Sequence, residues 1–252
     1  MIYVLLPVYN EEKNINVLID KIRTGLTWAK QEYKIVAYDD GSSDSSKARL
    51  EAKAASGVPL VILGEKDNRG LGYGLQILLR YVVDQSKNPA EDIAVILDAD
   101  NSHNPEHISS HMINKIRDGF DLVIASRYLK DSRVVGVSPF RVMLSYAASI
   151  LMQALFPIKG VKDYTCGYRA YRVEILKKAF AIFGDKLITE RSFACMAELL
   201  IKLGKMELLA VEIPLLLRYD QKLGASKMDI LKTVRRTLKL IIQLKMTHVN
   251  KQ

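Results

Sequence analysis

The sequence is poor in the residues that build cross-linked folds and zinc sites. It has two cysteines, Cys166 and Cys195, and four histidines in 252 residues. Two isolated cysteines argue against a disulfide framework and suit a reducing compartment. The histidines have no spacing typical of zinc ligands. With 49% hydrophobic and 26% charged residues, the composition is that of an ordinary globular protein.

The sequence also lacks an apolar run long enough to cross a bilayer. Residues 1–7 have no preceding basic segment and are too short for a signal peptide, so we expect a strand there. Residues 142–156 are apolar but are interrupted by Ser145, Ser149 and Gln153. This pattern favours an interfacial or buried helix over a membrane-spanning one.

Acidic residues are outnumbered, and the net charge of +9 predicts an anionic partner. No nucleic-acid-binding motif is present, so we do not expect nucleic acid. Basic residues gather after residue 227, where apolar positions recur at helical spacing. We therefore predict a main domain over residues 1–227 and a basic amphipathic helix over 228–252. This helix is suited either to an anionic membrane surface or to packing against the domain.

Short apolar runs alternate with helix-like segments in the first half of the chain. Strands are expected at residues 2–6, 34–38, 58–63, 93–97 and 122–126, with a later one at 213–217. This alternation predicts an α/β fold with a mostly parallel sheet flanked by helices. In such a sheet, ligands bind outside the carboxyl ends of the strands.

Polar clusters follow three of these strands, at residues 10–12, 39–42 and 98–100. Any one of them could be a helix cap or a turn. Three at the same edge of a sheet instead predict a ligand site. Asp98 and Asp100 end a rigid strand, and such a pair suits Mg²⁺ or Mn²⁺ completed by substrate phosphates. An acidic turn capping the next helix is the structural alternative.

Five segments together carry a resemblance to a known family. They are LPVYNE at 6–11, DDGSSD at 39–44, DAD at 98–100, SRY at 126–128 and GYRAY at 167–171. In this order they resemble family 2 glycosyltransferases of the GT-A fold, which use nucleotide-activated sugars. The resemblance is greatest to the dolichyl-phosphate mannose synthase-like, or polyprenyl-phosphate glycosyltransferase, group. It extends over nearly the whole chain.

The resemblance implies a nucleotide pocket in the amino-terminal half. Pro7, Tyr9 and Glu11 would line it, with Glu11 accepting hydrogen bonds from the ribose. Asp39 or Asp40 would meet the base.

The resemblance also assigns Asp98 and Asp100 to the metal and the diphosphate. The family often has a glutamine two residues after the second aspartate, where this sequence has Ser102. The departure leaves the choice between Mg²⁺ and Mn²⁺ open.

Arg127, Arg141 and Ser145 match the family positions that hold an acceptor phosphate. Guanidinium groups stay charged and offer several fixed donors to a phosphate, so two arginines can orient an anionic nucleophile. Surface arginines near a helix start are the alternative interpretation.

Two further segments resemble the parts of the family that enclose the sugar. Asp163 and Gly167 belong to a segment that closes over the donor sugar. Arg218, Ser226 and Lys227 belong to a basic, glycine-containing loop that could neutralise the leaving diphosphate and exclude water. A solvated charged loop is the alternative.

The resemblance implies an inverting hexosyltransferase that moves a sugar from GDP-mannose or a UDP-hexose to a polyprenyl phosphate. A phosphate acceptor is already anionic, so no side chain must deprotonate it. One alternative is transfer to a saccharide hydroxyl, for which Asp163 is a candidate base. A catalytically inactive nucleotide-sugar-binding or membrane-scaffold protein is the other, and the presence of both Asp98 and Asp100 argues against it. We expect a peripheral protein on the cytosolic face of a membrane. The sequence does not indicate whether the protein is a monomer or an oligomer.

Overall fold

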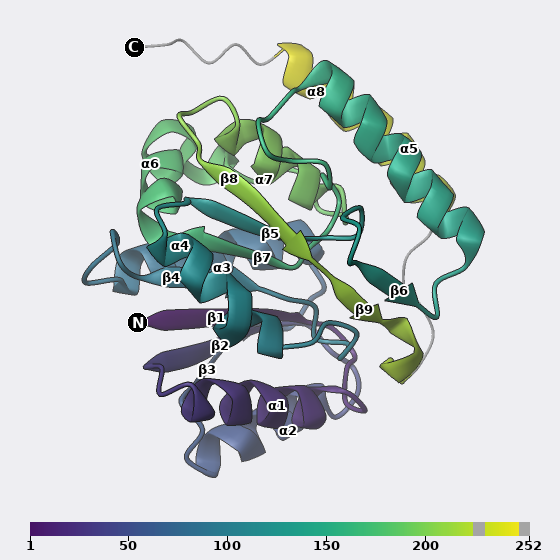
Figure 1. The fold of residues 1–252 in the computed structure, drawn as a ribbon. Coiled ribbons are helices and arrows are strands. Elements are labelled where there is room, and N and C mark those ends of the chain that lie inside the picture. Colours follow the sequence, from purple (N-terminus) through teal and green to yellow (C-terminus); the bar gives the residue numbers. More distant parts are fainter. Residues whose placement is uncertain (224–229, 247–252) are drawn as a thin grey trace.

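The computed structural model describes residues 1–223 and 230–246, and within them seven strands form one central sheet (Figure 1). Their order across the sheet is β3-β2-β1-β4-β7-β5-β8. The strands are β1 Ile2–Val8, β2 Tyr33–Asp40, β3 Leu60–Glu65, β4 Ile93–Ile96, β5 Leu122–Ser126, β7 Arg169–Arg172 and β8 Ala210–Pro214. All neighbours are parallel except β7, which runs antiparallel to β4 and β5. The predicted mostly parallel α/β fold is confirmed.

Helices cover both faces of this sheet. The helices are α1 Ile15–Trp28, α2 Ser46–Ala55, α3 Leu71–Gln85, α4 Ile113–Arg117, α5 Pro139–Leu155, α6 Val173–Phe183, α7 Cys195–Leu203 and α8 Ile230–Met246, with short helical turns at Ile108–Met112, Gly184–Lys186 and Tyr219–Gln221. α1 packs on α2, and α3 packs on α6 and α7. The chain moves outward from β1 to β3 and then returns to β4, so right-handed crossovers place α1 and α2 on one face and α3 on the other. Strands covered on both faces must be apolar, and β4 and β5 are buried along their whole length.

The strand expected at residues 213–217 is two strands in different sheets, and this part of the prediction was wrong. β8 ends at Pro214, and β9, Leu216–Arg218, pairs in parallel with β6, Arg133–Val135. Pro214 has no N–H and cannot donate to a continuing ladder. Leu215 instead donates to the Ser126 carbonyl at 3.1 Å and accepts from the Arg133 amide at 2.8 Å. The chain thereby crosses from the central sheet to the small one.

The last residue of segment 163–169, which was predicted to close over the sugar, is core structure. Residues 169–172 form β7, in the middle of the sheet, and Arg169 is fully buried. Its guanidinium donates to the Met196 carbonyl at 2.7 Å and to the Tyr164 carbonyl at 2.8 Å. Arg169 therefore links β7 to α7 and to the loop before β7 by hydrogen bonds.

The amphipathic helix predicted after residue 227 is present as α8. Leu240, Ile241 and Leu244 are buried against the rest of the protein, whereas Leu238 and Ile242 are 49% and 62% exposed. One face of the helix thus packs on the domain, and apolar residues remain exposed elsewhere on it. The boundary predicted at residue 227 lies outside the described residues and stays a prediction.

α5 also exposes large apolar side chains, and it covers nearly all of residues 142–156, which were expected to form an interfacial or buried helix. Phe140, Met143 and Ile150 are 60%, 61% and 49% exposed. Among the described residues, every helix is too short or too polar to cross a membrane.

Candidate functional site

A cavity of about 420 Å³ opens at the carboxyl edge of the sheet. The residues predicted for the site that line it are Pro7, Tyr9, Glu11, Asp40, Asp98, Asp100, Arg127, Arg141, Ser145 and Gly167. Asp39, Asp163 and Arg218 do not line it. Ser226 and Lys227 lie outside the described residues. The structure therefore brings the predicted nucleotide, metal and acceptor residues to one cavity.

Hydrogen bonds join the loop after β1 to the loop after β2. Most of the polar residues in the two loops take part in these bonds. The Asn10 amide donates to Ser42 Oγ at 2.9 Å, and Asn10 Oδ1 accepts from the Ser43 amide at 2.8 Å. The Glu11 amide donates to Ser46 Oγ at 2.7 Å. Asn10 has a φ of 53°, a left-handed conformation that asparagine tolerates better than most residues. These contacts hold the Glu11 side chain at the rim of the cavity.

Of the two aspartates at the end of β2, Asp40 lines the cavity and Asp39 does not. Asp40 lines the cavity and accepts the amides of Arg69 and Gly70 at 2.7 and 2.9 Å. Burial raises the pKa of Asp40, although the two amides oppose this shift. Asp39 is 5% exposed, and its Oδ1 atom has no hydrogen-bond partner in the described structure. Of the two, Asp40 is therefore placed to meet a ligand in this cavity.

Asp98 and Asp100 differ in their partners. Burial raises the pKa of Asp98, whose carboxylate accepts no hydrogen bond from the described residues. Asp100 accepts from Lys222 Nζ at 2.7 Å and from Ser102 Oγ at 2.6 Å. Burial opposes the charge of Asp100, but Lys222 and Ser102 outweigh it and lower the pKa.

This pair fits a metal ion shared with phosphates better than an all-protein metal site. The described residues hold no cluster of three or more His, Cys, Asp or Glu side chains that could bind a metal. Mg²⁺ typically takes one or two carboxylates and completes its shell with water and substrate phosphates. The Lys222 ammonium beside Asp100 shows that this position attracts a positive charge.

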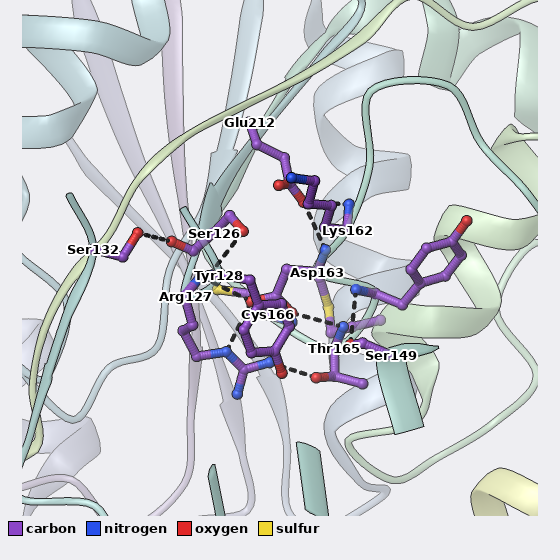
Figure 2. Close-up of polar contacts among 12 residues, drawn as sticks. Ser126, Arg127, Tyr128, Ser132, Ser149, Lys162, Asp163, Thr165, Cys166 and Glu212 are labelled. Atoms are coloured by element: carbon purple, nitrogen blue, oxygen red, sulfur yellow. Dashed lines mark hydrogen bonds and ion pairs between the residues drawn. The ribbon is translucent and has the colours of Figure 1, made fainter. Parts of the chain in front are cut away.

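Figure 2 shows Arg127 held by Asp163 at the end of β5. Asp163 accepts from Arg127 Nε at 2.8 Å and from Nη2 at 2.7 Å, and Nη2 also donates to Thr165 Oγ1. Burial opposes the guanidinium charge, but Asp163 outweighs it and raises the Arg127 pKa. These contacts fix the guanidinium plane and leave Nη1 without a hydrogen-bond partner among the described residues. Arg127 is thus a charged, oriented donor in the cavity wall.

Asp163 itself is unsuited to proton transfer. Its side chain is 0% exposed, and it also accepts the amides of Thr165 and Cys166 at 3.2 and 3.0 Å. Burial would raise its pKa, but Arg127 and the Thr165 amide outweigh burial and lower it. The structure therefore gives Asp163 the role of positioning Arg127, whereas its predicted contact with the sugar stays a prediction.

The second arginine comes from a different element. Arg141 and Ser145 lie one helical turn apart on α5, and both line the cavity that Arg127 lines. The Arg141 guanidinium lies 6.0 Å from the centre of the Tyr219 ring. Two arginines, one from α5 and one directly after β5, therefore reach the same cavity. Arg218, in contrast, pairs with Asp220 at 2.8 Å on the surface.

His103 and Phe193 are among the lining residues that the sequence interpretation missed. His103 accepts the Asp98 amide through Nδ1 at 3.3 Å and stacks on Tyr168 with ring centres 4.9 Å apart. Its position three residues after Asp100 was the available signal, but the histidines were considered only as zinc ligands. Phe193 lines the cavity from the loop before α7 and is 42% exposed. No local pattern marks Phe193, because tertiary packing alone brings its loop to the cavity.

The family model for glycosyl transferase family 2 matches residues 3–180. The chain belongs to glycosyl transferase family 2. It is a glycosyltransferase, and its central sheet and flanking helices form the GT-A fold.

This family 2 glycosyltransferase is similar to two curated relatives. It is 28% identical over 226 residues to the polyprenol monophosphomannose synthase of Mycolicibacterium smegmatis, a match that covers 90% of this chain and 80% of the relative. It is 30% identical over 212 residues to the dolichol-phosphate mannosyltransferase of Pyrococcus furiosus. That match covers 84% of this chain and 54% of the relative, so the chain spans about half of the Pyrococcus protein.

A solved structure supports the fold. Glucosyl-3-phosphoglycerate synthase from Mycobacterium tuberculosis, in complex with Mn²⁺, UDP and glucosyl-3-phosphoglycerate, superposes with a TM-score of 0.66 at 22% identity. The superposition covers 100% of this chain and 81% of that one.

Proposed function

We propose that this enzyme transfers a hexose, with mannose favoured, from a nucleoside diphosphate sugar to a polyprenyl phosphate. The observation that carries the proposal is the convergence of Arg127 and Arg141 on the cavity lined by Asp98 and Asp100. Two guanidinium groups and two carboxylates that line one cavity suit an acceptor phosphate at the arginines and a metal-bound donor diphosphate at the aspartates. The two curated relatives are named for mannosyl transfer to polyprenyl or dolichyl phosphate.

The donor end of the cavity would hold the nucleotide. Pro7, Tyr9 and Glu11 line this end together with Asp40, which suits Glu11 to the ribose and Asp40 to the base. GDP-mannose and a UDP-hexose both remain candidate donors.

Asp98 and Asp100 would hold Mg²⁺ or Mn²⁺. The bound cation would neutralise the charge that develops on the leaving diphosphate. Lys222, already paired with Asp100, adds a second positive charge on the same side of the cavity.

The acceptor phosphate would bind Arg127 Nη1, Arg141 and the Ser145 hydroxyl. Its oxygen forms a bond to the anomeric carbon as the bond from that carbon to the diphosphate oxygen breaks on the opposite face. The configuration is therefore inverted, and no proton is transferred. A saccharide hydroxyl would need a base, and Asp163 is buried with a lowered pKa. This favours the phosphate acceptor.

We propose that the enzyme acts as a peripheral protein on the cytosolic face of a membrane. Phe140 and Met143 of α5 are exposed near Arg141, and α8 exposes Leu238 and Ile242 among basic residues. Such faces suit an anionic bilayer surface. The two cysteines are buried and free, which suits a reducing compartment.

The membrane proposal is tested by flotation with vesicles containing anionic phospholipid at low salt. The wild type is expected to float, and the double variant Phe140→Asp, Met143→Asp is expected to float less. A matched pair of changes away from α5, Val17→Asp and Ile182→Asp, also replaces exposed apolar residues and serves as the control. Equal flotation of the two double variants would contradict the role of α5.

The catalytic proposal is tested by a donor screen. GDP-mannose, UDP-glucose and UDP-galactose are each incubated with Mg²⁺ or Mn²⁺ and a short polyprenyl phosphate, and nucleoside diphosphate release is measured. One donor is expected to give release that depends on the acceptor, and Asp100→Ala is expected to abolish it. Exposed Asp118→Ala is the matched control. Release with a free saccharide but not with the lipid phosphate would favour the saccharide alternative, and no release with any donor would favour an inactive protein.

A further inference from the structure

A short segment after β9 contributes Tyr219 and Lys222 to the lining of the cavity. We call residues 219–223 the strap. Lys222 Nζ contacts Asp100 Oδ2 at 2.7 Å, and Gln221 Oε1 accepts from Lys21 Nζ at 3.2 Å. The Leu223 backbone meets the side chain of Asn14. The strap is thus fastened both to the candidate metal residue and to α1.

Asn14 makes the most extensive of these attachments. Its Oδ1 accepts the Leu223 amide at 3.0 Å, and its Nδ2 donates to the Leu223 carbonyl at 3.1 Å. Nδ2 also donates to Glu11 Oε2 at 2.7 Å. Asn14 is 2% exposed, and both N–H groups of its amide are used. One buried side chain therefore joins a predicted ribose-binding residue to the strap.

This use of Asn14 is not what its position in the sequence favours. An asparagine directly before a helix usually caps it by accepting a hydrogen bond from the first turn. The Asn14 side chain makes no such bond to α1. It is committed to Leu223, 209 residues away, and to Glu11.

The contact at Leu223 also determines where Lys222 lies. Adjacent Cα atoms are about 3.8 Å apart, so fixing both polar groups of Leu223 restricts the backbone of its neighbour. The Lys222 and Asp100 side chains are 9% and 10% exposed. A lysine loses rotamer entropy when its side chain is ordered, and an unanchored strap would have to overcome this loss to reach the buried contact.

We propose that Asn14 is a positioning residue that couples Glu11 to the strap and thereby sets Lys222 beside Asp100. Its catalytic consequence rests on the proposed function, because Glu11 is the residue expected to hold the donor ribose. When the donor engages Glu11, the same asparagine holds the strap closed over the diphosphate. Donor recognition and placement of the Lys222 charge are then one event.

The coupling is tested by amide hydrogen exchange on the full chain without substrate. In the wild type the strap is expected to be protected. Asn14→Ala removes both hydrogen bonds to Leu223, and Asn14→Asp removes the one donated to the Leu223 carbonyl. Each is expected to speed exchange in the peptide covering the strap by at least about tenfold. Asn14→Asp keeps the size of the side chain but has no N–H donors, so it serves if the alanine variant folds poorly. Asn16→Ala, on the same helix, is the matched control and should leave strap exchange unchanged.

Glu11 supplies the second arm of the test. Glu11→Ala is expected to speed strap exchange by less than Asn14→Ala does, and the double variant should exchange no faster than Asn14→Ala alone. Strap exchange that is unchanged in Asn14→Ala and Asn14→Asp would overturn the anchor. Unchanged exchange in Glu11→Ala, or strictly additive effects, would overturn the coupling. These measurements need no substrate, so they succeed or fail independently of the donor screen.

Discussion

The ion pair between Arg127 and Asp163 gives the sharpest test of the site. Asp163 accepts five hydrogen bonds, three from Arg127 and two from the amides of Thr165 and Cys166. In Asp163→Asn, Oδ1 can keep the two amides, but an NH₂ group then faces the backbone amide and Nε of Arg127. The change also leaves a buried guanidinium without its counter-ion. Removing one partner of a buried pair costs about 3–5 kcal/mol, and we expect the lower end because the Arg127 side chain is 18% exposed.

The free energy of unfolding is measured by urea denaturation from pH 3 to 8. The folded-state pKa of Asp163 is lowered, so its stabilisation is complete above the unfolded-state pKa of about 3.9 and is lost as the pH falls through the folded-state value. The gap between wild type and Asp163→Asn should therefore be constant from about pH 5 to 8 and shrink below about pH 4.

Asp185→Asn is the control, because Asp185 pairs with Arg80 but its side chain is 97% exposed. The urea midpoint of this variant should equal that of the wild type. The reasoning would be refuted if Asp163→Asn were as stable as the wild type. It would also be refuted if the difference in their free energies of unfolding grew as the pH falls. The same variant should also raise the KM for the acceptor, since Arg127 loses its fixed orientation.

Three further changes test other parts of the structure. Gly72→Ala should destabilise the protein by about 1–3 kcal/mol, because a Cβ at this position would lie 1.8 Å from the Glu190 carbonyl oxygen; an unchanged urea midpoint would contradict this packing. Glu198→Gln should lower the free energy of unfolding by about 3–5 kcal/mol, because it leaves the buried Lys202 ammonium without its carboxylate 2.6 Å away. A loss no larger than for a surface pair would show that this contact matters little. Arg141→Ala should raise the KM for polyprenyl phosphate about 10- to 100-fold, as expected for a charge-assisted hydrogen bond, without changing nucleoside diphosphate affinity by calorimetry; an unchanged KM would remove Arg141 from the acceptor site.

The strand-end motifs were predictable because they depend on local patterns. The buried runs of β1, β4 and β5 read as strands from their apolar residues alone, and the polar residues that follow mark their carboxyl ends. Parallel topology then places Asp40 and Asp98 at one edge without any knowledge of distances. The structure places both in the wall of the same cavity.

The second half of the chain was harder to predict, because β7, β8 and β9 depend on contacts between distant residues. β7 reads as part of a loop because it is only four residues long and contains two arginines. Its burial depends on partners supplied by the loop before it and by α7, whose carbonyls accept hydrogen bonds from the two terminal nitrogens of the Arg169 guanidinium. The break between β8 and β9 likewise depends on which strands lie beside each half.

The sequence by itself determined the α/β class, the edge of the sheet that carries the site, and the residue types gathered there. Periodicity and strand order act over short stretches of chain, so they can be read without coordinates. Only the tertiary structure decided which polar groups meet. Arg127 pairs with Asp163, Asp100 with Lys222, and Asn14 with Leu223, across 36, 122 and 209 residues. Hydrogen bonds form only at close range and in particular directions, and the order of residues along a chain specifies neither for groups so far apart.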